Sequence, residues 1–219
     1  FGLDPIFNRP LGGHPYYVAV MEMNRYLHDT CTTMEQCAQV VVKNKKNAIQ
    51  NPHAAYGADI TLDQVLRSEM CFYPLKRLEI STPADGCVVM VLASEKVAEK
   101  LSDNPVWVRG VGWCTETPSL ETMDWSKAVY TRLAAETAYK TAKINSPRRE
   151  IDFAEIHDLF AYKELQHMEA LKLCEYGEAG KLTEEGLTAL DGELPLNPSG
   201  GLLGMGYGLE ASGMQKLLE

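Results

Sequence analysis

The sequence predicts an α/β protein whose strands and helices alternate through its second part. A continuous apolar run of strand length, CVVMVLA at 87–93, has the pattern of a strand buried on both faces, and VWVRGVGW at 106–113 is expected to form the next strand. A third strand is expected at 151–156, between helical patterns at 126–144 and 161–174. Strands that alternate with helices in this way indicate a layered βαβ fold.

The first 81 residues predict helices and loops and no βαβ unit. Three helices are expected there, over 16–28, from a cap at Thr32 or Thr33 to about Ala48, and over 62–68 after a cap at Thr61. Shorter elements are expected later in the chain: helices at 95–101, 182–190 and 211–218, and a short strand at 194–196.

Composition limits the class of function. The net charge is -9 and the Lys and Arg residues are scattered, which argues against nucleic acid as a partner. None of the six cysteines forms a C-x-x-C pair, so we expect reduced thiols, no metal site and a cytoplasmic protein. No run of about 18 apolar residues occurs, so no membrane span is expected. The start at Phe1 rather than Met is what we expect of an internal fragment.

The segment 154–160 is the first candidate for chemistry. An apolar strand would place His157 and Asp158 at its end, just before a helix, where α/β sheets bind ligands. An imidazole there can transfer a proton near pH 7 or stabilise an oxyanion. From position alone, a structural role for His157 beside the following helix is equally consistent.

A glycine-rich segment is the second candidate. Residues 200–213 contain six glycines, which permit close backbone approach and leave N–H groups free to bind an anion at a helix start. A tight connection between sheet and helix would explain the same glycines. The remaining histidines are interpreted as structural: His14, His28, His53 and His167.

Motifs along nearly the whole chain resemble the thiolase superfamily, in particular its sterol-carrier-protein-type and archaeal branch. NPHA at 51–54 is similar to the Asn-Pro-x-Ala loop of that family. EIHDLF at 155–160 resembles its His-Asp-Cys-Phe strand end, and LNPSGGLL at 196–203 resembles its Asn-x-Ser/Gly-Gly-Gly segment.

The resemblance implies a fold of two similar α/β halves. Residues 82–219 would form most of the C-terminal domain, incomplete at its C-terminus, and residues 1–81 would be the helical loop region of the upstream half. The nucleophilic cysteine of the family would lie upstream of Phe1, and its second reactive cysteine after Glu219.

The resemblance also implies catalytic roles for His157 and Tyr207. Related thiolases have Gly-His-Pro-x-Gly-Ala-Thr-Gly where this chain has GYGLEASG, so Tyr207 stands where a histidine activates the nucleophilic cysteine. A phenol with a pKa of about 10 is a poor base at pH 7 but a good hydrogen-bond donor. Substrate-binding roles are implied for Asp158, Phe160, Asn197, Ser199, Gly200, Gly201 and Gly206.

Three functions are consistent with this pattern. The motif around His157 favours a thiolase-type acyltransferase that cleaves or forms a C–C bond in 3-oxoacyl-CoA thioesters with CoA, and this is the leading interpretation. Tyr207 favours a retro-aldolase acting on a 3-hydroxyacyl-CoA, similar to the thiolase-fold enzymes of steroid side-chain degradation. A non-catalytic scaffold subunit is the third, although the retained His157 and segment 197–201 argue against it.

The resemblance implies partners as well. Coenzyme A would be a substrate, and no bound cofactor is expected in this chain. The protein would form a homodimer, or a heteromer with a small zinc-ribbon/OB-fold protein that helps to bind the acyl-CoA.

Overall fold

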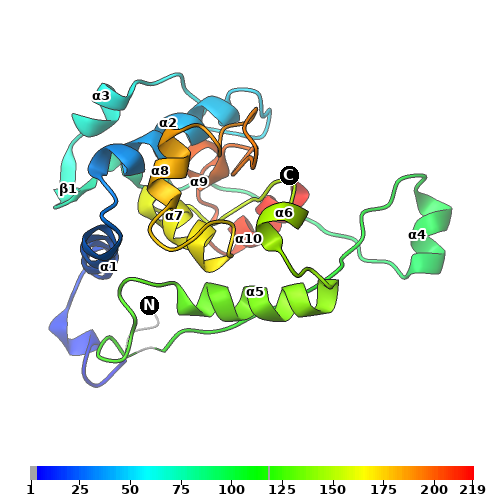
Figure 1. The fold of residues 1–219 in the computed structure, drawn as a ribbon, viewed down its shortest axis with the longest axis horizontal. Coiled ribbons are helices and arrows are strands. Elements are labelled where there is room, and N and C mark those ends of the chain that lie inside the picture. Colours follow the sequence, from blue (N-terminus) through cyan, green and yellow to red (C-terminus); the bar gives the residue numbers. More distant parts are fainter. Residues whose placement is uncertain (1–3, 118) are drawn as a thin grey trace.

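The computed structural model describes residues 4–117 and 119–219, and these residues are largely helical (Figure 1). The helices are α1 (Pro15–Thr30), α2 (Met34–Ala48), α3 (Leu62–Leu66), α4 (Glu95–Leu101), α5 (Val129–Ala142), α6 (Pro147–Glu150), α7 (Ala161–Ala170), α8 (Ala179–Glu184), α9 (Gly201–Met205) and α10 (Ser212–Leu218). Short 3₁₀ helices are η1 (Arg9–Leu11), η2 (Arg77–Glu79) and η3 (Leu209–Ala211). Strands β1 (Met70–Phe72) and β2 (Leu75–Lys76) form an antiparallel pair.

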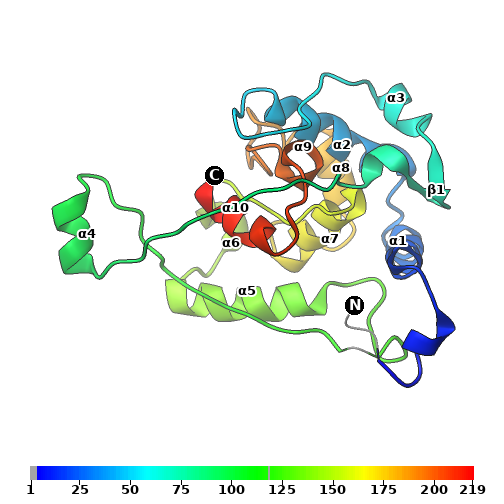
Figure 2. The same ribbon diagram turned by 180° about the vertical axis from the view of Figure 1, so that it is seen from behind.

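Helix α2 lies at the centre of the core. Helices α3, α7, α8 and α9 pack against it, and it is enclosed in both views (Figures 1 and 2). Val40 and Val41 on α2 are fully buried, as are Leu165 on α7 and Leu196 before α9. The core therefore joins helices from the first 81 residues to helices near the C-terminus. The domain boundary at residue 81 stays a prediction.

Local capping fixes the starts of the early helices as predicted. The Thr33 hydroxyl accepts a hydrogen bond from the backbone N–H of Gln36, and the Gln36 side chain accepts one from the backbone of Thr33. The same reciprocal pair joins Thr61 to Gln64 at the start of α3. Such capping boxes satisfy backbone donors that the first helical turn leaves free.

Helix α5 ends two residues and α7 four residues before its predicted end, each near a lysine in the left-handed conformation. Lys143 has φ 62° just after α5, and Lys172 has φ 57° shortly after α7. The helix predicted at 182–190 is wrong in position: α8 begins earlier and ends at Glu184, because the chain turns through Gly186 at φ 83°. Left-handed residues commonly end helices because they break the helical backbone path.

The predicted strands at 87–93, 106–113 and 151–156 do not form ladders among the described residues. A ladder needs a neighbouring strand about 4.8 Å away, and no described strand pairs with either of the first two runs. Their side chains are consequently exposed: Val91 by 85% and Val106 by 96%. The third run and the predicted strand at 194–196 meet only at a parallel bridge between Ala154 and Leu196.

Residues 87–113 form an arm that carries α4 away from the core (Figures 1 and 2). The returning part of the arm passes along α5. Its two glycines face that helix: a Cβ on Gly112 would lie 1.9 Å from the Ala134 carbonyl oxygen, and one on Gly110 would lie 2.2 Å from that of Ala138. The spacing of these glycines thus permits backbone-to-backbone contact with α5.

Candidate active site

The segment that carries His157 is held by side chains rather than by strand pairing alone. The Ile156 N–H donates to Asn197 Oδ1 at 2.8 Å. The carbonyl of Asp158 accepts from the Ser81 hydroxyl at 2.8 Å, and Ser81 N–H donates to the Leu159 carbonyl at 2.9 Å. Buried backbone groups without such partners would be costly, so these bonds fix the backbone on both sides of His157.

His157 and Tyr207 come together, as the sequence predicted for a shared site. Their rings meet edge to face, with centroids 6.4 Å apart and planes at 88°. His157 comes from the segment before α7, and Tyr207 follows α9. An imidazole and a phenol at this separation can act on one small group placed between them, because each provides a proton donor or acceptor.

The surroundings of His157 favour its neutral form. Desolvation by packed neighbours lowers its pKa below the ordinary value, and the charges of Lys216 and Lys163 act in the same direction. Asp158 opposes this shift. His157 nevertheless keeps an exposed face. The ring is thus accessible and is biased toward a neutral imidazole, the form that can accept a proton.

Tyr207 is positioned by its backbone. Its N–H donates to the Thr82 carbonyl at 2.8 Å, and its carbonyl accepts from the Ala84 N–H at 3.0 Å. These bonds form a parallel bridge to Pro83. They use only the backbone of Tyr207 and do not involve its phenol. The side chain is half-buried. The glycine-rich segment therefore presents one tyrosine to His157 from a fixed loop.

Asp158 is fully buried, and its carboxylate accepts hydrogen bonds at the start of α9. Its carboxylate accepts from the Leu202 N–H at 2.7 Å and the Leu203 N–H at 3.2 Å. Asn44 of α2 donates to it at 2.9 Å, and Lys216 Nζ lies 3.3 Å away. The N–H groups that the sequence suggested for a ligand anion are thus partly occupied by a carboxylate from the chain itself.

Gly201 permits the contact between Asp158 and α9. Its φ is 59°, and a Cβ there would lie 2.2 Å from Asp158 Oδ2. A side chain at this position would displace the carboxylate and would strain the backbone. This glycine is therefore explained by internal packing.

The other predicted substrate-binding residues are also buried. Phe160 packs edge to face on Tyr16, with centroids 5.8 Å apart, and stacks on Tyr162 at 6.0 Å. Asn197 donates to Glu164 Oε2, and the Ser199 N–H donates to Glu155 at 2.9 Å. The buried set is Asp158, Phe160, Asn197, Ser199, Gly200, Gly201 and Gly206. These residues therefore make internal contacts within the fold. Their direct contact with substrate stays a prediction.

His167 was interpreted from the sequence as structural, and it lies on α7 beside His157. Its Nδ1 lies 3.0 Å from the His157 carbonyl oxygen, and its Nε2 lies 3.0 Å from the Tyr130 hydroxyl. The rings of His157 and His167 are 6.2 Å apart. The available signal was weak: α7 places His167 ten residues after His157, but only the fold shows that the ring turns back toward it.

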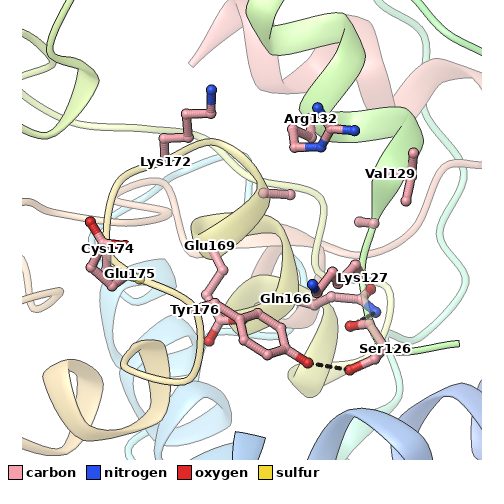
Figure 3. Close-up of a pocket in the computed structure, with 12 residues that line it drawn as sticks. Ser126, Lys127, Val129, Arg132, Gln166, Glu169, Lys172, Cys174, Glu175 and Tyr176 are labelled. Atoms are coloured by element: carbon pink, nitrogen blue, oxygen red, sulfur yellow. Dashed lines mark hydrogen bonds between the residues drawn. The ribbon is translucent and has the colours of Figure 1, made fainter. Parts of the chain in front are cut away.

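Two pockets lie on either side of the contact between Tyr130 and α7. One, of about 350 Å³, is lined by His157, His167, Tyr130, Glu155 and Leu171, among others. The other, of about 390 Å³, lies between the start of α5 and the end of α7 (Figure 3). Its Tyr176 hydroxyl is hydrogen-bonded to Ser126. Of the predicted site residues, His157 lines the first pocket and none lines the second, and Tyr207 lines neither. The candidate site is therefore the first pocket where it opens at His157, whose ring meets that of Tyr207.

Comparison with known proteins identifies the family. A sequence model of the family described as thiolase C-terminal domain-like matches residues 112–219. The acetyl-CoA acetyltransferase of Methanothermobacter thermautotrophicus is 36% identical over 200 residues, covering 91% of this chain and 52% of that protein. A solved aldolase described as Ltp2-ChsH2(DUF35) has a TM-score of 0.84 and 25% identity, covering 96% of this chain and 56% of that one.

This chain belongs to the thiolase superfamily. It corresponds to the C-terminal part and has the thiolase-like α/β fold. A further solved structure, the monomeric SCP2-thiolase-like protein type 1 of Mycobacterium smegmatis, has a TM-score of 0.68 at 18% identity, over 94% of this chain and 44% of that one. The chain spans about half the length (52%) of the acetyl-CoA acetyltransferase that it matches.

Membership makes two substitutions in this thiolase-superfamily chain informative. Leu159 stands where the related His-Asp-Cys-Phe motif has cysteine, and Tyr207 stands at the histidine of the glycine-rich motif. Leu159 follows closely after His157 in the chain, and the ring of Tyr207 meets that of His157 in space. The resemblance to these motifs therefore predicts a site that has the imidazole of His157 and a phenol at the position of the second imidazole. No helix among the described residues has the length and apolar character needed to cross a membrane.

Proposed function

We propose that this chain provides the acid–base part of an enzyme that cleaves 3-hydroxyacyl-CoA thioesters by a retro-aldol step. The placement of the Tyr207 phenol beside the His157 imidazole carries this proposal. The resemblance of the fold to an aldolase, at a TM-score of 0.84, supports it.

The step needs a base for the hydroxyl proton and a donor for the thioester oxygen. Neutral His157 removes the proton from the 3-hydroxyl group, the C2–C3 bond breaks, and its electron pair moves into the thioester as an enolate. Tyr207 donates a hydrogen bond to the enolate oxygen. The carbonyl product leaves, and protonation at C2 yields the shortened acyl-CoA, so that atoms and charge balance without an oxidant.

Thiolysis of a 3-oxoacyl-CoA is the second candidate. The acetyl-CoA acetyltransferase relative at 36% identity favours it. In that case a cysteine from the remainder of the protein would carry the acyl group, and His157 and Tyr207 would stabilise the same enolate. The replacement of the family's histidine by Tyr207 weighs against this candidate, because a phenol is a poor base for a thiol at pH 7.

The partner follows the same proposal. The aldolase that this chain resembles is described together with ChsH2(DUF35), which supports a heteromer here with a small acyl-CoA-binding subunit. A homodimer is the other assembly we expect. Coenzyme A enters as part of the substrate.

Product analysis separates the two reactions. The full-length protein, with its partner, is incubated with matched 3-hydroxyacyl-CoA and 3-oxoacyl-CoA, each with and without free CoA, and products are identified by mass spectrometry. We expect an aldehyde or ketone and a shortened acyl-CoA from the 3-hydroxy substrate without added CoA. CoA-dependent cleavage of only the 3-oxo substrate would replace the retro-aldol proposal with thiolysis, and turnover of neither would favour the scaffold interpretation.

A further inference from the structure

We infer that His167, held by Tyr130, is a positioning residue that fixes His157 for the proposed reaction. Three hydrogen bonds carry the inference: His167 Nδ1 to the His157 carbonyl at 3.0 Å, His167 Nε2 to the Tyr130 hydroxyl at 3.0 Å, and Lys163 Nζ to that hydroxyl at 3.4 Å. Only the expected effect of His167 on turnover rests on the proposed function.

The direction of each bond follows from what the atoms can donate. A carbonyl oxygen only accepts, so Nδ1 of His167 carries a hydrogen. His167 is almost fully buried, at 5% exposure, and burial lowers its pKa well below the ordinary value, as do the charges of Lys163 and His157. A neutral imidazole has a single N–H, so Nε2 must accept from the Tyr130 hydroxyl.

The far end of this chain of bonds is also fixed. The Lys163 ammonium donates to the Tyr130 oxygen and pairs with Glu22 of α1 at 2.6 Å. Glu22 is buried and accepts two further bonds, from the Tyr162 hydroxyl at 2.9 Å and the Gln166 amide at 3.1 Å. The donors therefore run in one direction, from Lys163 through Tyr130 and His167 to the His157 carbonyl.

This arrangement acts on the peptide that carries the proposed base. Neighbouring bonds already fix Ile156 through Asn197 and Asp158 through Ser81. His167 adds the bond at His157 itself, and the Tyr130 hydroxyl supports the same tautomer by donating to Nε2. Catalytic groups need to be held within about 0.5 Å of their working geometry, so loss of this bond should reduce turnover more than substrate binding.

The groups that face the two imidazoles come from several elements. Asp158 and Lys216 face His157, Lys163 and His157 face His167, and Tyr130 reaches His167 from α5. Because Lys163 and Lys216 are cations, they oppose a second positive charge on either ring. His167 should therefore stay neutral across the working pH range of the enzyme.

Nitrogen-15 NMR of the histidines in the full-length protein tests the inference without any assay of activity. We expect His167 in the Nδ1–H tautomer from about pH 5.5 to pH 8, with its signals assigned by their loss in His167→Asn. In Tyr130→Phe the Nδ1–H tautomer should persist, because its bond to the His157 carbonyl remains, and the Nε2 signal should shift because that nitrogen loses its hydrogen-bond donor. An Nε2–H or doubly protonated His167 in the wild type would overturn the inference.

Kinetics then test positioning with a matched pair of variants. His167→Asn keeps an N–H donor near the position of Nδ1, whereas His167→Leu has none. We expect kcat to fall about tenfold or more in His167→Leu with KM changed less than about twofold, and to recover to within about threefold of wild type in His167→Asn. Equal losses of kcat in two variants that melt at the same temperature would overturn the positioning role. Failure of the wild type to cleave either substrate would reject the proposed function, while the tautomer measurement would still decide the role of His167.

Discussion

At the residue scale, the environment of the site assigns different roles to its two rings. Packing and the charges of Lys216 and Lys163 lower the pKa of His157 and favour the imidazole that can accept a proton. Tyr207 contributes a hydroxyl that donates. The sequence predicted both residues from motifs, and the structure brings their rings to 6.4 Å. His167 was missed because its contact depends on how α7 packs, which no local pattern encodes.

Glu79 provides a separate test of buried electrostatics. Its side chain is fully buried, one oxygen accepts from the Lys76 N–H at 2.8 Å, and the other has no partner among the described residues. Burial raises its pKa to about 7. A carboxyl whose pKa rises on folding binds its proton more tightly in the folded state. Its contribution to stability is therefore present below the unfolded pKa and is lost as the pH rises toward 7.

We predict that Glu79→Gln becomes more stable relative to wild type as the pH rises from about 4.5 to 8, by on the order of 1–3 kcal/mol. Urea unfolding at several pH values measures the difference. The comparison with wild type is necessary because burial also raises the pKa of Glu169 to about 7. The exposed Glu175→Gln serves as a control for removal of one charge. Parallel stability curves for wild type and Glu79→Gln would contradict the prediction.

At the element scale, helices were predicted better than strands because their determinants are local. The capping boxes at Thr33 and Thr61 can be identified from a few neighbouring residues, and both are present. A strand requires a partner from elsewhere in the chain, so the apolar runs at 87–93 and 106–113 predicted buried strands where the described structure has an exposed, unpaired arm. The same limit applies to α8, whose position depends on packing against α2 and α7.

Contact between the arm and α5 gives a prediction at this scale. Gly112→Ala places a methyl group 1.9 Å from the Ala134 carbonyl oxygen, so the backbones must separate. We expect a loss of about 1–3 kcal/mol in the free energy of unfolding. The control is Gly213→Ala on α10, where a Cβ meets no atom within 4 Å and where alanine should stabilise by up to about 1 kcal/mol. Equal effects of the two changes in denaturant titrations would show that the arm does not lie against α5.

At the scale of the whole molecule, one core joins regions that the sequence placed in different domains. Val41 of α2 shares this core with Leu165 and Leu203. The alternation of predicted strands and helices indicated an α/β class, and the motif resemblance implied the thiolase-like fold, which the comparisons confirm. Neither could show that α2 would supply Asn44 to the Asp158 carboxylate, because that bond joins residues 114 positions apart in the chain.

Both candidate reactions pass through a thioester enolate, and exchange of the C2 hydrogens measures the formation of this enolate. The full-length protein is incubated with acetyl-CoA or propionyl-CoA in D₂O, and deuterium at C2 is followed by mass spectrometry. We predict exchange by the wild type and by Tyr73→Phe, which changes an exposed tyrosine. Tyr207→Phe and His157→Gln should each slow exchange by about 10²-fold or more, and the double variant little further, because both act on one enolate. Exchange at the wild-type rate in Tyr207→Phe and His157→Gln would contradict the assignment of these two residues to the chemistry.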